Sequence, residues 1–361
     1  MKLENLGGAP KIDIHAHYFG ERYLRFLEDQ DVDTRLGRNS RARASGMVER
    51  LRLLDEAEIE FQIVSGAPFF PTFDDAEVAA EAATLHNDEL IEFVASSQGR
   101  FGGFIVLPFP HIDESLAELT RVGNLPGVYG CAFGVTGLGR SLVDPEYDCV
   151  LERIRDLGII VFVHPVGNAC GFYSAQFDQT WLVGAVFEDV AFITDLLTSS
   201  WLDDHAGIEI VVPHLGGVVP FILQRIDDQF RVRTLGKDVK VPSSRVSALR
   251  YDTVNSDPRS LKYAVDVYGA DRVLFGTDFP YLPEPMWDDA VHYIRAAGLS
   301  DREVQSIEYK NASQLLKRNV ALRTWCRRQT QLVHRLGSRR TFPRTAPEAM
   351  ASRILLIWSR G

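Results

Sequence analysis

The chain has 361 residues, of which 45% are hydrophobic and 24% charged, and its formal net charge at pH 7 is -10. This balance supplies enough apolar side chains for a large buried core and excludes a chain that is disordered throughout. It also argues against nucleic acid as a partner, because phosphate neutralisation requires clustered lysine and arginine.

Short apolar or β-branched segments recur along the chain and alternate with longer segments of helical period. Such alternation is typical of strand–helix units, in which helices cross over between parallel strands. The strand candidates lie at residues 12–15, 61–65, 101–107, 128–133, 159–164, 208–214, 249–254 and 272–278. The clearest helix candidates lie at residues 74–97, 145–157, 182–204, 257–268 and 300–317.

Eight strand candidates predict an α/β fold, a TIM-type (β/α)₈ barrel, that occupies residues 1–319 as one domain. An open doubly wound sheet is the alternative, but no GxGxxG or other glycine-rich phosphate loop follows the first strand to support it. Residues 35–50 are polar and rich in arginine. We therefore expect a loop insertion there, above the mouth of the barrel and after the first strand.

The first strand candidate ends in the sequence IDIHAH, which places His15 and His17 two residues apart. Alternate residues of a strand point to the same face, so both imidazoles can reach one metal ion. Two solvated histidines at the end of a surface strand are the structural alternative.

Three later strand candidates also end in residues that can bind a metal: His164, His214 and Asp278. Barrel strands present side chains to the active site at this end, so the recurrence favours one shared site. Nitrogen and oxygen donors of this kind suit Zn²⁺, with Mn²⁺, Fe²⁺ and Co²⁺ as alternatives. The remaining histidines are expected to be structural or solvated: His86, His111, His205, His292 and His334.

Residues 320–361 contain nine arginines and one glutamate, a charge of about +8, so residues 1–319 carry about -18. We interpret this basic C-terminal extension as disordered; a packing arm in an oligomer and a nucleic-acid-binding tail are the alternatives. Four cysteines without CxxC spacing, and no signal-peptide pattern, predict a cytoplasmic protein. No apolar stretch is long enough to predict a membrane span.

The order of the strand-end motifs resembles the amidohydrolase superfamily, and more narrowly its branch with aminocarboxymuconate-semialdehyde decarboxylase and the resorcylate-type decarboxylases. The resemblance covers about residues 11–318. It implies that His15, His17, His164 and Asp278 ligate the metal ion and that His214 is an acid/base group next to it.

The resemblance also implies residues that bind the substrate. Arg225 matches an arginine that binds a substrate carboxylate across a subunit interface, which implies a homodimer, and Trp181 matches a tryptophan near the substrate. Tyr281 departs from the family, because the decarboxylase has phenylalanine there. The branch takes another substrate-binding arginine from the loop after the first strand, for which this sequence offers Arg38, Arg41 and Arg43.

Lysine usage bears on the number of metal ions. Binuclear members of the superfamily commonly bridge two metals with a carboxylated lysine, but no lysine occurs between Lys11 and Lys237. A single ion is therefore favoured. A carboxylate that bridges two ions is the remaining alternative, but the sequence offers no evident candidate for it.

The implied activity is a metal-dependent carboxy-lyase, a non-oxidative decarboxylase of an aromatic or unsaturated carboxylic acid, with His214 and Asp278 as candidates for proton transfer. The main alternative is a mononuclear hydrolase of a lactone, amide or related bond. Hydration of a double bond and a metal-binding protein without catalytic activity are the further alternatives.

Overall fold

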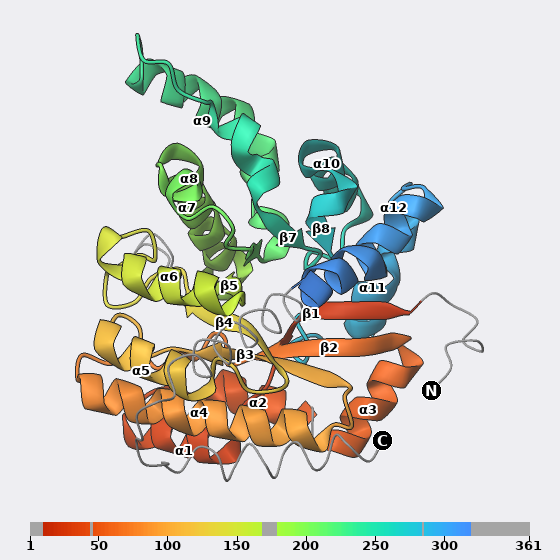
Figure 1. The fold of residues 1–361 in the computed structure, drawn as a ribbon. Coiled ribbons are helices and arrows are strands. Elements are labelled where there is room, and N and C mark those ends of the chain that lie inside the picture. Colours follow the sequence, from red (N-terminus) through yellow and green to blue (C-terminus); the bar gives the residue numbers. More distant parts are fainter. Residues whose placement is uncertain (1–9, 44–45, 168–178, 284, 319–361) are drawn as a thin grey trace, which may run out of the picture.

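The computed structural model describes residues 10–43, 46–167, 179–283 and 285–318 (Figure 1). Eight parallel strands form one sheet, hydrogen-bonded in chain order from β1 to β8. They are β1 (Lys11–His17), β2 (Ile59–Ser65), β3 (Phe101–Val106), β4 (Val128–Gly134), β5 (Ile160–His164), β6 (Ile210–Val212), β7 (Arg250–Asp252) and β8 (Val273–Leu274). The basic extension predicted at residues 320–361 lies outside the described residues.

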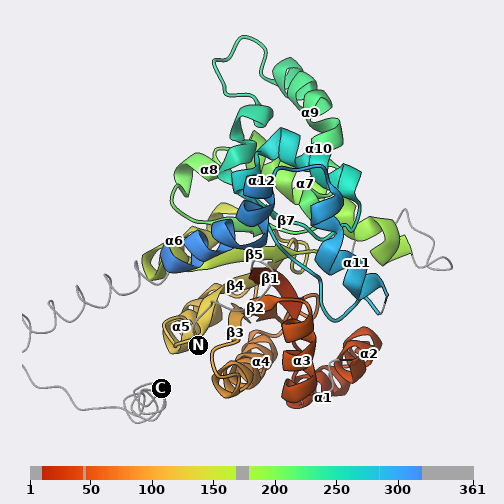
Figure 2. The same ribbon diagram turned by 90° about the vertical axis from the view of Figure 1, so that its right-hand side faces the viewer.

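Backbone hydrogen bonds join β1 to the segment after β8 and nearly close the sheet into a barrel. The His17 amide donates to the Phe279 carbonyl over 2.7 Å, and the Asp278 amide donates to the His15 carbonyl over 2.9 Å. Figure 2 shows the strands at the centre of the molecule and the helices at its periphery. Eight parallel strands in chain order confirm the TIM-like architecture, and the doubly wound alternative is wrong.

The helices follow the strands and pack around them. They are α1 (Glu21–Asp29), α2 (Arg35–Arg43), α3 (Met47–Glu56), α4 (Ala76–Ser96), α5 (Ile112–Val122), α6 (Asp148–Leu157), α7 (Ala185–Thr198), α8 (Trp201–Asp204), α9 (Val219–Arg233), α10 (Pro258–Tyr268), α11 (Met286–His292) and α12 (Asp301–Gln305). After α12, a π-helical turn at Ser306–Lys310 continues as helix to residue 318. Among the described residues, no helix is both long and apolar enough to cross a membrane.

Apolar strand residues fill the interior of the barrel. One cluster unites Ile14 of β1, Phe104 of β3, Phe162 of β5 and Leu274 of β8, each at most 1% exposed. Because these strands lie around the barrel, their side chains meet in its interior, where the Phe104 and Phe162 rings stack with centroids 5.4 Å apart. The ring of His15 packs against Phe162 at 5.0 Å, so the histidines of β1 adjoin this core.

The strands that precede His214 and Asp278 end earlier in the structure than predicted. β6 ends at Val212 and β8 at Leu274, so His214 and Asp278 lie in the loops beyond these strands. Both residues have left-handed backbone, with φ of 55° and 60° respectively. Strand residues do not adopt such angles, and in residues other than glycine they are concentrated at functional sites.

The prediction of a loop at residues 35–50 is wrong, because residues 35–43 form α2 and residues 47–50 begin α3. Small residues explain the error. A Cβ on Gly37 would lie 2.9 Å from the ring of Phe69, and Ser40 is fully buried. A helix that packs through small residues shows no hydrophobic period, and its sequence therefore resembles that of a polar loop.

Candidate metal centre

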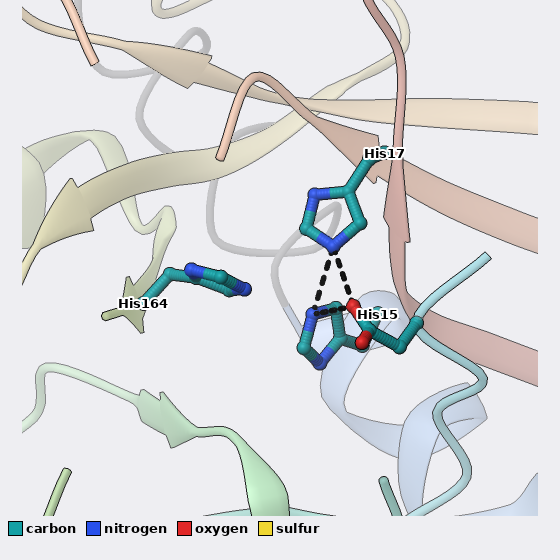
Figure 3. A group of neighbouring side chains, drawn as sticks. His15, His17 and His164 are labelled. Carbon is teal, nitrogen blue, oxygen red and sulfur yellow. Dashed lines mark hydrogen bonds and ion pairs between the residues drawn. The ribbon is translucent and has the colours of Figure 1, made fainter. Parts of the chain in front are cut away.

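Two histidines at the carboxyl end of β1 face each other inside the barrel. His15 and His17 are fully buried, and their Nε2 atoms lie 3.1 Å apart (Figure 3). The alternation of side chains along a strand accounts for their shared face. The lone pairs of two ring nitrogens this close repel each other unless a proton or a cation lies between them.

His164 of β5 and Asp278 of the loop after β8 complete the cluster. Asp278 Oδ1 lies 2.8 Å from His17 Nε2 and 3.2 Å from His15 Nε2. His164 Nε2 is buried and has no hydrogen-bond partner among the described residues. One donor atom from each of the four residues lies within 4.8 Å of the others. The structure thus brings together the four residues that the resemblance implied as ligands.

The Nδ1 atoms of His15 and His164 lie within hydrogen-bond distance of groups outside the cluster. His15 Nδ1 lies 2.6 Å from Asp252 Oδ2, and His164 Nδ1 lies 2.8 Å from the carbonyl oxygen of Pro165. With Nδ1 engaged as a donor, each ring directs the lone pair of Nε2 into the cluster, as metal-binding histidines do. Three imidazole nitrogens and one carboxylate oxygen fit a divalent metal ion.

The charges around the cluster also favour a cation. Burial disfavours the charged form of His15, but Asp252 and Asp278 outweigh it and raise the pKa of the ring to about 10. Burial lowers the pKa of His17 to about 4 and that of His164 well below its usual value. The Asp278 carboxylate therefore lies beside the neutral His17 ring. A metal ion held by His15 would take the place of the proton that Asp252 and Asp278 favour there.

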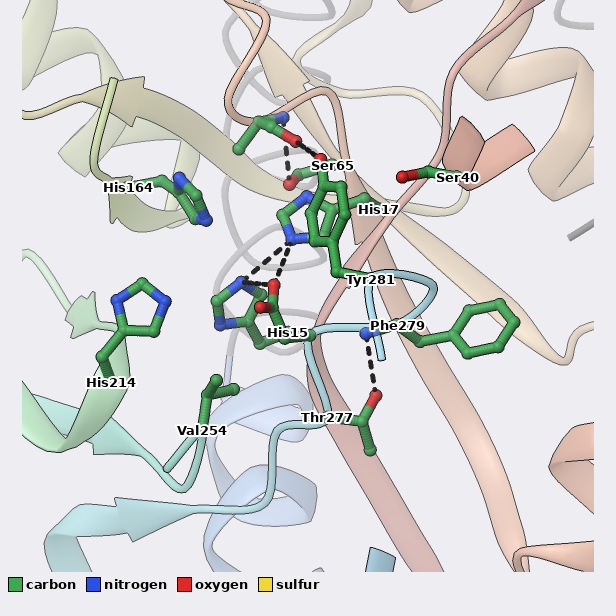
Figure 4. A network of polar contacts seen from close by, with 12 residues as sticks. His15, His17, Ser40, Ser65, His164, His214, Val254, Thr277, Phe279 and Tyr281 are labelled. Carbon is green, nitrogen blue, oxygen red and sulfur yellow. Dashed lines mark hydrogen bonds and ion pairs between the residues drawn. The ribbon is translucent and has the colours of Figure 1, made fainter. Parts of the chain in front are cut away.

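His214 lies beside the cluster and faces the same space as His15 and His164 (Figure 4). Its ring centroid is 5.6 Å from each of theirs. His214 Nδ1 lies 2.8 Å from Asp189 Oδ2 of α7, and Asp189 is fully buried. Burial opposes protonation of His214, but the Asp189 carboxylate outweighs it and raises the pKa of the ring. The pair suits a group that holds and donates a proton.

Sequence reasoning missed two carboxylates of this site, Asp252 and Asp189. Asp252 ends β7, and its Oδ1 accepts a hydrogen bond of 2.9 Å from the His214 amide while its Oδ2 contacts His15. Its position at a strand end was a signal that could have found it, because residues there reach the active-site face. Asp189 lies within a helix, and no local pattern marks it.

Tyr281 and Trp181, the two aromatic residues expected near the substrate, lie at different places around the metal centre. Tyr281 is half-buried, its ring centroid lies 4.8 Å from that of His17, and its hydroxyl donates to the Ala67 carbonyl over 3.4 Å. Trp181 lies in the π-helical turn Thr180–Gly184, is 40% exposed and lines a cavity at the barrel mouth.

The arginines expected to bind a substrate carboxylate have different surroundings. Arg38 of α2 forms ion pairs with two glutamates of α1, at N–O distances of 2.7 and 2.8 Å. Arg225 is exposed on α9, which extends away from the barrel in Figure 1. The side chains of Arg41 and Arg43 lie outside the part that the structure describes. Arg38 thus already has two carboxylate partners, whereas Arg225 is open to solvent.

A buried arginine supports the histidines from the α3 side of the sheet. Arg50 is 2% exposed, and its guanidinium donates to the His17 carbonyl over 2.9 Å and to Gln62 Oε1 over 2.8 and 3.0 Å. The Gln62 amide donates to Asp13 Oδ2 over 2.6 Å, and Asp13 Oδ1 accepts from the His15 amide over 3.0 Å. This chain of hydrogen bonds holds the backbone of both β1 histidines.

Replacing Arg50 by methionine is expected to lower the free energy of unfolding by roughly 2–4 kcal/mol, because the buried His17 carbonyl and Gln62 Oε1 lose their charged hydrogen-bond donor. Arg52→Met is the matched control. Arg52 lies on the same helix, is 49% exposed and pairs with Glu49 and Glu56, so its loss should cost at most about 1 kcal/mol. Denaturant unfolding measures both variants, and equal losses would contradict the role of Arg50.

Comparison with known proteins adds to this geometry. The family model described as Amidohydrolase matches residues 12–318. The gamma-resorcylate decarboxylase of Polaromonas sp. is 28% identical over 332 residues, which cover 86% of this chain and 99% of that protein. The 2-amino-3-carboxymuconate-6-semialdehyde decarboxylase of Dictyostelium discoideum is 24% identical over 296 residues, 75% of this chain and 82% of that protein.

The fold is similar to that of a solved structure, the dihydroxybenzoic acid decarboxylase from Polaromonas sp. with manganese and the inhibitor 2-nitroresorcinol. The TM-score is 0.74 at 25% identity, and the match covers 86% of this chain and 98% of that one.

Proposed function

Because the chain belongs to the amidohydrolase family, we propose that it is a metal-dependent carboxy-lyase, a non-oxidative decarboxylase of an aromatic or unsaturated carboxylic acid. The observation that carries the proposal is the cluster of three histidines and one aspartate with the His214–Asp189 pair beside it. The similarity to decarboxylases over most of the chain supports the same reaction.

Loss of CO₂ leaves negative charge on the carbon that carried the carboxylate, and this carbon must then gain a proton. A divalent ion, when bound, stabilises that charge through oxygen atoms of the substrate. His214 holds a proton that it can deliver, because Asp189 raises the pKa of its ring. Asp278 is the second candidate. Its carboxylate is one of the four donors of the cluster, where a bound cation would favour the ionised form, and this favours His214 as the proton donor.

We propose one divalent ion per chain, ligated by His15, His17, His164 and Asp278. Zinc is the first candidate, because nitrogen and oxygen donors suit it. Manganese is the competing candidate, because the Polaromonas structure contains it. Elemental analysis of the purified protein decides between them, and two tightly bound ions per chain would contradict the mononuclear centre.

We also propose a homodimer in which Arg225 binds the substrate carboxylate in the partner's site. Phe221 and Val232 are 82% and 70% exposed and share one face of α9, since eleven residues make about three helical turns, and an exposed apolar face supports an interaction surface there. Random mixing of Arg225→Ala chains with His164→Ala chains should restore about one quarter of the wild-type activity, because half of the dimers are mixed and each has one complete site. No recovery in a verified mixed dimer would contradict the shared site.

The reaction itself is tested with protein loaded with zinc or manganese and offered hydroxybenzoates, muconate-type acids and lactones. We expect CO₂ release that chelation abolishes and reloading restores. Hydrolysis of a lactone or amide without any CO₂ release would overturn the proposal in favour of the mononuclear hydrolase.

A further inference from the structure

A cavity of about 520 Å³ opens at the barrel mouth, and the proton transfer described above makes no use of it. Its wall is formed by the segments that follow β2, β4 and β5, together with α1 and α2. These segments leave the carboxyl ends of the strands, which is the face of the barrel where the histidine cluster lies.

Two connections link the cavity to the metal centre. Val166, in the wall, follows His164 by two residues. Phe69, also in the wall, packs edge to face on Phe19 with centroids 5.4 Å apart, and the Phe19 ring stacks 6.3 Å from that of His17. The cavity therefore lies beside the side chains that pack on the histidine cluster.

Most of the side chains that line the cavity are apolar, and they carry little charge. Aromatic side chains supply much of it: Phe69, Phe70, Phe73 and Trp181. Asp33 is the single charged residue among the described residues that line it, and it pairs with Arg35 at an N–O distance of 2.6 Å. No lysine, arginine or histidine is among these lining residues. A carboxylate that loses water without gaining a cation is disfavoured, so these side chains favour an apolar group over a second acid group.

We propose that this cavity binds an apolar substituent, an alkyl chain or a second ring, of a monocarboxylic aromatic substrate. The inference rests on the proposed decarboxylase function and narrows its substrate to acids with a single carboxylate. The volume is sufficient, since an apolar cavity of about 150 Å³ already holds benzene. Each methylene that leaves water here strengthens binding by roughly fourfold.

Calorimetric titration of the metal-loaded full chain tests this inference. The ligands are 2-hydroxybenzoates with straight alkyl chains of one to six carbons at each free ring position, and analogues with a second carboxylate in place of the chain. Affinity should rise with chain length at one ring position. The dicarboxylic acid with its second carboxylate at that position should bind roughly tenfold more weakly than the methyl analogue, or worse.

Two substitutions of Leu36, a residue of α2 in the wall, separate the cavity from the rest of the molecule. Leu36→Trp fills the cavity and should remove the gain from the alkyl chain, while the unsubstituted acid keeps its affinity within about twofold. Val48→Trp is the control, because Val48 is 84% exposed on α3 and outside the wall. Leu36→Arg supplies a cation and should reverse the preference toward the dicarboxylic acid. Melting temperatures verify that each variant is folded.

The outcomes distinguish the cavity from the reaction. Binding that depends on chain length and is lost in Leu36→Trp, without CO₂ release from any acid, supports the cavity and overturns the decarboxylase. CO₂ release from unsubstituted acids without any effect of chain length supports the decarboxylase and overturns the cavity. Equal losses in Leu36→Trp and Val48→Trp, or no binding of any acid, also overturn the cavity.

Discussion

Replacing His164 by alanine is expected to abolish both binding of the divalent ion and turnover, while the barrel stays folded. The ring supplies an Nε2 atom that is buried and has no other partner among the described residues, and its loss leaves three donors. Metal affinity should fall by more than about 100-fold, since loss of a partner outside the ligand set alone typically costs 10–100-fold. The apolar interior of the barrel does not depend on the ion, so thermal unfolding should remain cooperative.

Elemental analysis, turnover and melting temperature, measured on one preparation, check this result. His292→Ala is the control, because His292 is 44% exposed on α11 and lies outside the cluster. Asp252→Asn should be intermediate, with a loss of about 10–100-fold in metal affinity, because Asp252 orients His15 without being a donor of the cluster. Wild-type metal content and turnover in His164→Ala would remove His164 from the site.

Replacing His214 by alanine is expected to leave the bound ion in place and lower kcat by roughly 10²–10⁴-fold, the usual contribution of a general acid or base. His214 lies beside the cluster without belonging to its four donors, and Asp189 holds its Nδ1. If His214 donates the proton, wild-type activity falls as pH rises through the pKa of this ring. Because the Asp189 carboxylate raises that pKa, Asp189→Asn should move the fall to lower pH.

Metal content, melting temperature and the pH dependence of kcat identify the role of His214. A merely structural histidine predicts a lower melting temperature in His214→Ala and unchanged turnover of the folded protein. Joint loss of the ion and of activity would place His214 among the ligands. An unshifted pH profile in Asp189→Asn would mean that the Asp189 carboxylate does not tune the proton donor.

Local patterns were sufficient for the strand order and for most of the candidate site. His15 and His17 share a face because side chains alternate along a strand, and this holds whatever lies around them. His164 ends a buried strand and therefore reaches the mouth of a barrel. The same rule placed His214 and Asp278 at the correct end of the molecule, although left-handed backbone angles carry both residues beyond their strands.

The tertiary structure decided which groups act on these residues. Asp252 meets His15 across 237 residues of sequence, and Asp189 meets His214 across 25. Such pairs form only when the barrel closes, so no local period records them. The support of β1 by Arg50 and the apolar cavity likewise arise from side chains of several elements packed together. Strand and helix periods are properties of neighbouring residues and can be read from the sequence, whereas hydrogen-bond partners, pKa shifts and cavity volume depend on distances that only the folded chain sets.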